Sequence, residues 1–171
     1  MVGTDLRLRA EEAVPLLHTL VARAAADLGL RVLAIKGPVV ALQGIRAPRA
    51  SADLDVLVHP RDLGPLVEGL VALGWRRAVE GTYASIMPPH STNLLSDLWP
   101  VAMDVHHYFP GFLADAGEVF DALWARHETV TLAGVAVPAC DPVGQVAILA
   151  LHHLRVSPEG DSPALRDLSD H

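Results

Sequence analysis

The segment 53–58 reads Asp-Leu-Asp-Val-Leu-Val, and its pattern narrows the folds that are open to this chain. Successive side chains of a β-strand point to opposite faces of the sheet. Asp53 and Asp55 would therefore share one face, while Leu54 and Val56 share the other as part of an apolar, core-facing stripe. The segment predicts a strand with one packed face and one face that carries two neighbouring carboxylates.

Two carboxylates side by side repel each other, and a cation between them relieves that repulsion. Hard cations such as Mg²⁺ take oxygen ligands, commonly one or two carboxylates plus substrate phosphates. A second predicted strand contains Met103-Asp104-Val105-His106, in which Asp104 and His106 share a face. If the two strands are neighbours, three carboxylates converge, as a two-metal site requires. A D-x-D pair alone is also common as a solvated strand edge or loop cap, so that alternative stays open.

Helical and extended segments alternate at first, and extended segments crowd together later. The apolar periodicity and the cap residues Gly29, Gly74 and Asp141 predict helices at 5–28, 38–45, 61–73, 115–125 and 142–155. Strands are predicted at 31–36, 53–58, 75–80, 83–88, 93–96 and 100–107, with a hairpin or strand at 129–137 and a last turn at 164–170. This order predicts an α+β (mixed α/β) fold with a mixed sheet and helices packed on one face.

Composition excludes several classes of protein. With 171 residues, 51% apolar and 19% charged, the chain suits one compact domain and is too short for two. The charged N-terminus is unlike a signal peptide, the lone cysteine cannot form an internal disulfide, and no apolar run has the length of a membrane span. We therefore expect a cytoplasmic protein without a membrane partner. The net charge of −7, without a basic run, disfavours a large nucleic acid as partner.

The order of the motifs resembles that of the DNA polymerase β-like nucleotidyltransferase superfamily. It is most similar to a poorly characterised bacterial branch that carries a Lys-Gly turn before its D-x-D strand. The resemblance spans about residues 30–110 and rests on the ordered set Lys36-Gly37, Arg49, Asp53-x-Asp55, Gly74-Trp75 and Met103-Asp104-Val105-His106. It implies a nucleotidyltransferase-like catalytic domain over residues 1–140, first helix included, followed by a helical extension over 141–171 that is short or truncated.

The resemblance also implies roles for single residues. Asp53 and Asp55 match the paired metal ligands, and Asp104 matches the third carboxylate, which helps to activate the attacking hydroxyl. Gly37 matches the glycine turn that leads into the phosphate-facing helix, and Arg49 matches the arginine before the acidic pair. The superfamily's usual Gly-Ser pair is replaced here by Lys-Gly-Pro, which is typical of this branch.

The chemistry of these side chains agrees with those roles. A glycine at 37 lets the backbone approach a phosphate, and a helix N-terminus attracts anions. Lys36, the only lysine among 13 basic residues, and Arg49 would neutralise triphosphate oxygens. His106 is expected either to contact a phosphate or the acceptor, or to be a polar residue on the rim. Four other arginines are expected to be solvated surface charges: Arg46, Arg61, Arg76 and Arg77.

The predicted activity is a two-metal transfer of a nucleoside monophosphate from an NTP, such as ATP, to an acceptor hydroxyl, with Mg²⁺ or Mn²⁺. The acceptor is a small molecule, a protein side chain or an RNA end. A chain as short as this one could complete its site by forming a homodimer. One alternative is a non-catalytic regulatory partner on the same fold that binds nucleotide or protein. A weaker one is a His/Asp metal hydrolase, although the adjacent histidines lack the spacing of a zinc motif. His152 and His153, late in a helix, are expected to have a structural or capping role, with a reach of His152 into the cleft as the alternative.

Overall fold

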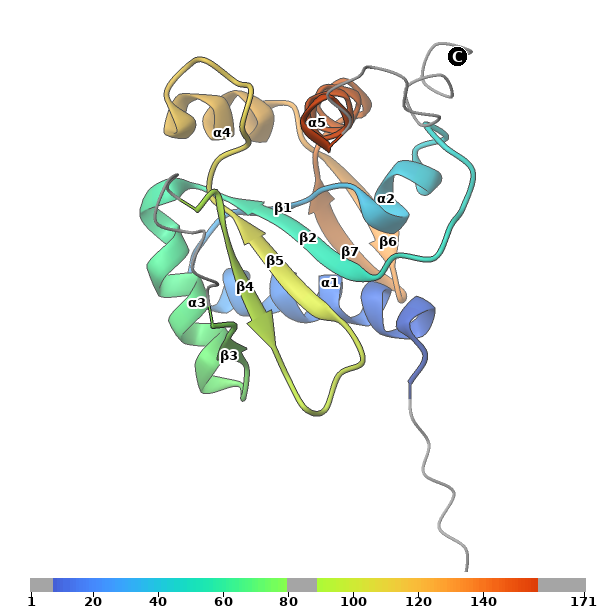
Figure 1. Cartoon of the computed structure of the whole chain (residues 1–171), viewed down its shortest axis with the longest axis vertical. Helices are drawn as coiled ribbons and strands as arrows, with labels where there is room; N and C mark the ends of the chain where they lie inside the picture. Colours follow the sequence, from blue (N-terminus) through green and yellow to red (C-terminus); the bar gives the residue numbers. More distant parts are fainter. Residues whose placement is uncertain (1–7, 80–88, 157–171) are drawn as a thin grey trace, which may run out of the picture.

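A computed structural model describes residues 8–79 and 89–156, which form a mixed seven-stranded sheet with helices on both sides (Figure 1). The strand order is β3-β4-β5-β2-β1-β7-β6. The strands are β1 (Val32–Ala34), β2 (Asp53–Val58), β3 (Arg76–Arg77), β4 (Ser91–Leu95), β5 (Ala102–His106), β6 (Glu128–Leu132) and β7 (Val135–Ala139). The helices are α1 (Ala10–Asp27), α2 (Gly37–Leu42), α3 (Leu63–Ala72), α4 (Ala116–Ala125) and α5 (Pro142–Val156), with a 3-10 turn η1 (Pro60–Asp62).

The two strands that carry the acidic residues are parallel neighbours in the middle of the sheet. In the register of β2 and β5, Asp55 lies directly opposite Asp104, and Leu57 lies opposite His106. Residues paired in this way point to the same face. The sheet therefore brings the two acidic segments together, as predicted, although they are about fifty residues apart in sequence.

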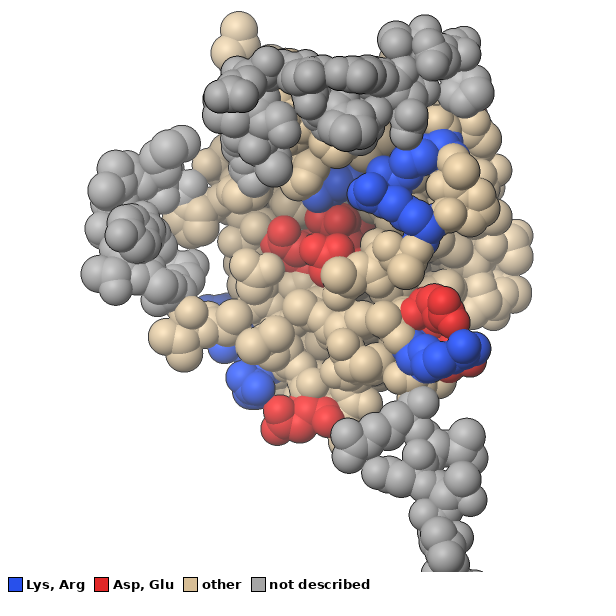
Figure 2. Space-filling model, turned by 45° about the vertical axis from the view of Figure 1, so that its right-hand side comes forward, with Lys and Arg blue, Asp and Glu red and all other residues tan. Residues whose placement is uncertain are grey.

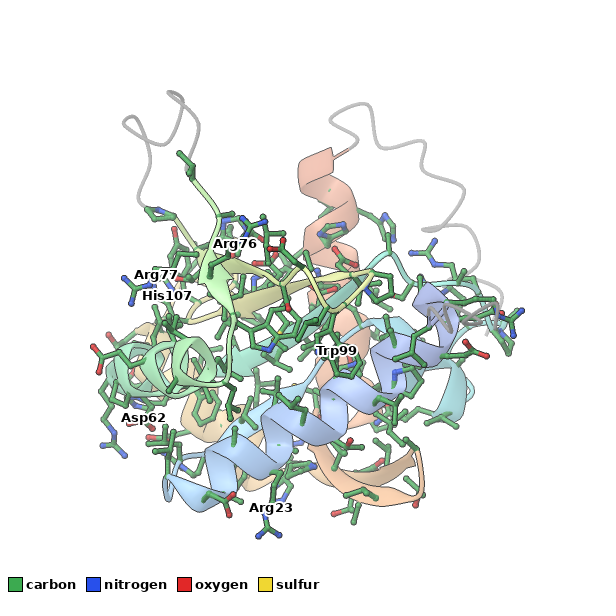
Figure 3. All side chains as sticks on the ribbon, turned by 90° about the horizontal axis from the view of Figure 1, so that it is seen from below. Arg23, Asp62, Arg76, Arg77, Trp99 and His107 are labelled. Atoms are coloured by element: carbon green, nitrogen blue, oxygen red, sulfur yellow. The ribbon has the colours of Figure 1, made fainter. Side chains whose placement is uncertain are left out.

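One face of the sheet is covered by α1 and α3. Leu54 and Val56 of β2 pack in the same buried cluster as Met103 and Val105 of β5 and aliphatic side chains of both helices. Figure 3 shows Trp99 in the layer between the sheet and α1, whereas Arg23 points away from the sheet on the outer side of that helix. The apolar residues between the aspartates thus fix the strand's orientation, because turning β2 over would expose this cluster.

The other face is covered only in part, by α4 and α5. Leu33, Leu57, Phe120 and Ile148 belong to a second buried cluster, formed by β1, β2, α4 and α5. The fold class predicted from the sequence is confirmed, but the expectation that helices pack on one face is wrong in this detail. Because Leu57 lies under these helices and Asp55 lies two residues before it, the acidic end of β2 begins where the apolar cover ends.

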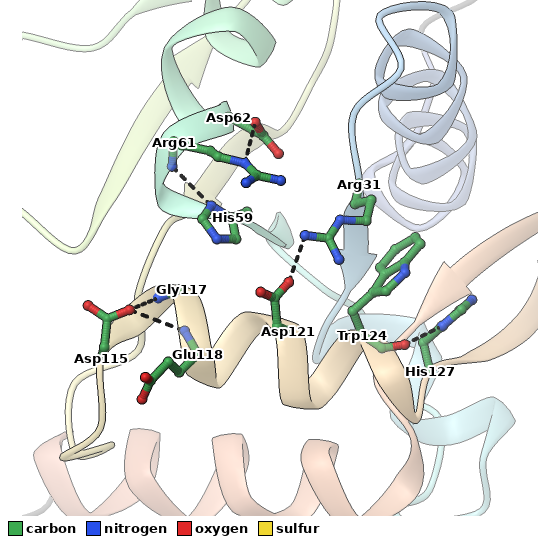
Figure 4. A network of polar contacts seen from close by, with 10 residues as sticks. All are labelled: Arg31, His59, Arg61, Asp62, Asp115, Gly117, Glu118, Asp121, Trp124 and His127. Atoms are coloured by element: carbon green, nitrogen blue, oxygen red, sulfur yellow. Dashed lines mark hydrogen bonds and ion pairs between the residues drawn. The ribbon is translucent and has the colours of Figure 1, made fainter.

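Side-chain caps and ion pairs hold α4 and α5 in place. Asp115 accepts hydrogen bonds from the first turn of α4, and Asp121 in the same helix binds Arg31 at 2.6 Å, just before β1 (Figure 4). At the start of α5, Asp141 accepts a hydrogen bond from the Gly144 amide at 2.9 Å and thereby caps the helix as predicted. These contacts fix α5 at its N-terminal end.

Several predicted boundaries differ from the structure. The first helix begins at Ala10 rather than at residue 5, with Leu8 and Arg9 non-helical and residues 5–7 outside the described part. The first strand ends at Ala34 because Lys36 has a positive φ, which no regular strand accommodates. The segment 129–137 is a hairpin, β6–β7. The predicted strand at 83–88 and the turn at 164–170 lie outside the described residues, and the division at residue 140 stays a prediction.

None of the described helices is both long enough and apolar enough to cross a bilayer.

Candidate active site

A cleft of about 240 Å³ opens beside the acidic end of β2. It is enclosed by the turn at 36–37, the loop 46–52, the start of β2 and one side of α5. Figure 2 shows this hollow, with acidic side chains gathered in it and basic side chains directly beside them. A cleft with both signs of charge suits a polyanion that binds together with cations.

The carboxylates lie at different depths in this cleft. Asp55 is 6% exposed, Asp104 is half-buried and Asp53 is exposed at the mouth. One ligand atom each from Asp55, Asp104 and His106 lie within 4.8 Å of one another. The convergence of the acidic strands is therefore confirmed for the 55/104 pair, with Asp53 at the entrance.

His106 lies beneath the carboxylates rather than on a rim. It is 2% exposed, and its Nε2 atom is 2.9 Å from Asp55 Oδ1 and 3.2 Å from Asp104 Oδ2. Burial opposes protonation, but the hydrogen bonds to Asp104 and Asp55 raise the pKa of His106 above its ordinary value. The alternative of a solvated rim residue is wrong. The geometry makes His106 an N–H donor that orients both carboxylates, which is unlike a metal-binding histidine with a free lone pair.

Lys36 approaches Asp55 from the other side. Its Nζ atom is 2.6 Å from Asp55 Oδ1, the same oxygen that His106 contacts. Burial works against ionisation, yet the His106 hydrogen bond and the Lys36 charge hold the pKa of Asp55 below its ordinary value. Asp55 is thus a carboxylate at neutral pH and is held between the Lys36 ammonium and the His106 imidazole.

The outer carboxylates differ from each other. Partial burial and then the Asp55 charge raise the pKa of Asp53, whereas hydrogen bonds from His106 and Ser91 overcome burial and lower the pKa of Asp104. The Oδ1 atom of Asp104 is buried and has no hydrogen-bond partner among the described residues. A buried oxygen of this kind calls for a ligand. Together with two more carboxylates, it fits the oxygen-rich donor set that Mg²⁺ and Mn²⁺ prefer.

The opposite wall of the cleft is basic. Arg46 and Arg49 come from the loop before β2, and His152 and His153 come from α5. Burial and the nearby charges of Arg49 and Arg46 lower the pKa of His153, so this histidine is harder to protonate than a free imidazole. The concentration of cations on this wall favours an anionic ligand that carries several charges.

Most residues singled out from the sequence meet in this cleft. Asp104 and His106 lie next to Asp55 at the floor of the cleft. The other five line the cleft directly: Lys36, Gly37, Arg49, Asp53 and Asp55. The expectation that Arg46 is a solvated surface charge is wrong, because it is half-buried in the cleft wall. Its position in the loop that leads into Asp53 was a signal that the sequence offered. His152 and His153 both line the cleft, so the structure favours the alternative that His152 reaches it.

A histidine that the sequence did not single out lies below the Lys36-Gly37 turn. His18 of α1 is 1% exposed, and neither ring nitrogen has a hydrogen-bond partner among the described residues. A Cβ atom at Gly37 would lie 3.8 Å from its Nε2 atom. Burial lowers the pKa of His18 from 6.5 to about 4.

This burial predicts a loss of stability in mild acid. Since the pKa is lower in the folded than in the unfolded chain, the unfolded chain binds the proton first as the pH falls through 6.5. The stability contributed by neutral His18 is then lost progressively down to pH 4, with about 2 kcal/mol gone by pH 5. Urea unfolding at pH 7.5 and pH 5 measures this loss, and we expect His18→Phe to show about 2 kcal/mol less of it. Equal losses in both proteins would contradict the assignment.

Solved structures with a similar fold are nucleotidyltransferases. The antibiotic-resistance factor ANT(2″)-Ia, in complex with adenylyl-2″-tobramycin, has a TM-score of 0.61 and 16% identity over 91% of this chain and 85% of that one. The lincomycin-bound lincosamide antibiotic adenylyltransferase LnuA has a TM-score of 0.53 and 14% identity over 91% and 92%. A candidate nucleotidyltransferase from Thermotoga maritima has a TM-score of 0.60 and 12% identity over 98% of both chains.

Sequence comparison agrees with the structural one. Residues 8–171 match the family described as uncharacterised nucleotidyltransferase. No curated protein matches the sequence. The identities of 12–16% to solved structures establish a shared fold, whereas the family match extends over nearly the whole chain.

Proposed function

Because the chain belongs to the family of uncharacterised nucleotidyltransferases, we propose that it transfers a nucleoside monophosphate from an NTP to an acceptor hydroxyl with the help of divalent cations. The observation that supports this most is the pairing of Asp55 with Asp104 across β2 and β5, at the floor of a cleft with a basic wall. A divalent cation suits the first feature and a triphosphate suits the second.

In this proposal the reaction is an in-line displacement at the α-phosphorus. The acceptor oxygen forms a bond to phosphorus, the bond to the bridging oxygen breaks, and pyrophosphate leaves. When bound, Mg²⁺ or Mn²⁺ would neutralise phosphate charge and favour ionisation of the acceptor hydroxyl. Asp53 and Asp55 would hold the cations, and Asp104 would present its unpartnered oxygen to the cation or proton on the acceptor side. His106 keeps the two inner carboxylates in this arrangement.

The basic wall would bind the part of the nucleotide that leaves. Lys36, Arg46 and Arg49 lie in the cleft with Asp53 and Asp55, so their charges can stabilise the pyrophosphate as negative charge develops on it. Protein groups of this kind act by position and charge, with little covalent chemistry. In this proposal the carboxylates bind the cations, and the basic wall binds the leaving pyrophosphate.

For the acceptor we favour a small hydroxylated molecule over an RNA end or a protein side chain. Two proteins of similar fold hold small molecules, adenylyl-2″-tobramycin and lincomycin. A net charge of −7 gives no long-range attraction to RNA. The cytoplasmic location and the homodimer stay predictions. A regulatory partner that only binds nucleotide remains the second candidate, because it would use the same basic wall without needing cations.

Thermal unfolding in the presence of nucleotides separates these functions. With one of ATP, CTP, GTP or UTP at about 100 times its Kd, binding adds about 2.7 kcal/mol of stability and raises Tm by several degrees. We expect this shift only when Mg²⁺ or Mn²⁺ is also present. We expect the double change Asp53→Asn with Asp55→Asn to abolish it, and Asp97→Asn, which alters an exposed carboxylate outside the cleft, to preserve it.

The other outcomes decide against the proposal in distinct ways. A shift of equal size without divalent cations would support the binding protein. Zinc that stays with the protein through purification would support the metal hydrolase. A shift that survives the double substitution would place the nucleotide outside this cleft.

A further inference from the structure

The backbone at Lys36 has a conformation that side chains normally avoid. Its φ of 54° and ψ of −149° lie in a region that is almost restricted to glycine, and such a residue costs about 1–3 kcal/mol. Among the described non-glycine residues, only Ala133 also has a positive φ, and it lies in the β6–β7 turn. Strain of this kind persists only where surrounding contacts impose it.

A buried glutamine from α5 makes the contacts that surround this strained residue. Gln145 is 0% exposed, and its Oε1 atom accepts a hydrogen bond from the Lys36 amide at 2.9 Å. Its Nε2 atom donates to the Ala34 carbonyl at 3.1 Å. Between these two residues, the Ile35 amide donates to the Asp55 carbonyl at 3.2 Å. The end of β1 is therefore held by hydrogen bonds to α5 on one side and to β2 on the other.

These hydrogen bonds determine the direction in which the Lys36 side chain leaves the backbone. The Lys36 side chain leaves the strained turn toward β2, and its Nζ atom lies 5.5 Å from the centre of the Phe109 ring and 2.6 Å from Asp55 Oδ1. An extended backbone at this position would continue β1 and turn the side chain in another direction. The position of the ammonium group thus depends on the conformation that the Gln145 amide holds.

We propose that Gln145 is a positioning residue of this site: its side-chain amide hydrogen-bonds to the backbone on both sides of Ile35 and so directs the Lys36 ammonium toward Asp55. The consequence for turnover rests on the proposed function, while the structural claim does not. Only a group that donates and accepts at once can replace this amide. Methionine offers neither bond, and an ionised glutamate accepts but cannot donate to the Ala34 carbonyl.

The single lysine makes the structural claim directly measurable. A sample labelled with ¹⁵N-lysine gives one backbone amide signal, that of Lys36, whose hydrogen bond to Gln145 should slow its hydrogen exchange. We expect Gln145→Met to move this signal and to speed its exchange by at least ten-fold. Gln43→Met is the matched control, because the Gln43 amide donates to the Cys140 carbonyl at 2.8 Å and does not contact Lys36. An unchanged signal in folded Gln145→Met would overturn the proposal.

A second variant keeps the test decisive if Gln145→Met does not fold. In Gln145→Glu, the introduced carboxyl can both donate and accept while it is protonated, and it loses the donor when it ionises. The Lys36 signal should therefore match that of the unaltered protein at low pH and depart from it as the pH rises. The ionisation of the introduced carboxyl is followed by ¹³C NMR in the same samples, and a Lys36 signal that keeps the course of the unaltered protein through that ionisation would overturn the proposal.

Turnover is measured on the same proteins. Misplacement of a catalytic group by about 1 Å lowers rates on the order of 100-fold. We expect that loss in Gln145→Met, a change within about three-fold in Gln43→Met, and recovery in Gln145→Glu only on the acidic side. If the unaltered protein turns over no NTP while the Lys36 signal responds as expected, the proposed function fails and the positioning role stands. If the unaltered protein turns over NTP but the Lys36 signal does not change in Gln145→Met, the proposed function stands and the positioning role fails.

Discussion

The substitution Asp55→Asn is expected to lower nucleotidyl transfer by a factor on the order of 10³ or more while the chain stays folded. Asp55 is the innermost carboxylate, 6% exposed, and its Oδ1 atom receives both Lys36 and His106. The asparagine keeps the shape and removes the charge that would hold a cation against the triphosphate. Preorganised charge of this kind contributes several kcal/mol to a transition state.

Release of pyrophosphate from each NTP measures this loss, with Asp97→Asn as the matched control. Asp97 is an exposed aspartate that pairs with Arg76, outside the cleft, and its substitution should leave turnover within about two-fold. Unfolding must remain cooperative in both variants, so that the loss reflects chemistry and not misfolding. Turnover within ten-fold of the unaltered protein in Asp55→Asn would remove Asp55 from the reaction.

Removal of divalent cations should abolish turnover altogether. The buried Asp104 Oδ1 atom has no partner among the described residues. A triphosphate that enters the cleft brings further negative charge next to Asp53 and Asp55, and a divalent cation is needed to offset it. A chelator such as EDTA should therefore stop pyrophosphate release, and added Mg²⁺ or Mn²⁺ should restore it. Ca²⁺, which is larger and less strict in geometry, should support binding better than turnover.

This second prediction has its own control and contradiction. The chelator must leave Tm unchanged without nucleotide, because the three buried clusters that form the core consist of apolar residues and include none of the carboxylates. Turnover that continues at full rate in excess EDTA would contradict a cation-dependent mechanism. Restoration by Zn²⁺ alone would favour the His/Asp hydrolase chemistry instead.

The parts of the site that the sequence predicts are those encoded locally. The alternation in 53–58 determines which side chains of β2 face the core, so the shared face of Asp53 and Asp55 follows from the pattern alone. The same holds for Asp104 in β5. The glycine turn after Lys36 is also local, and Gly37 has the positive φ of 51° that such a turn requires.

What could not be predicted depends on contacts between distant segments. Gln145 reaches Lys36 only because β1 pairs in parallel with β7, which places the start of α5 next to the end of β1. The burial of His106 depends on its place in the register with β2 and on the rings of His90 and Phe109, whose centres lie 5.4 Å and 5.5 Å from that of His106. Nothing in the spacing of these residues along the chain indicates either contact. The presence of helices on both faces was missed for the same reason.

The position of Mn²⁺ in crystals grown with the cation and a non-hydrolysable NTP analogue tests the acidic cleft as a metal-dependent nucleotide site most directly. Anomalous scattering should locate two ions, roughly 3.5–4 Å apart, that are bound by oxygens of Asp53, Asp55 and Asp104 and by the phosphates. The triphosphate should extend toward Arg46 and Arg49. Ions bound elsewhere would contradict the assignment. So would an analogue that occupies the cleft with no ion at Asp55, whose only contacts are then Lys36 and His106.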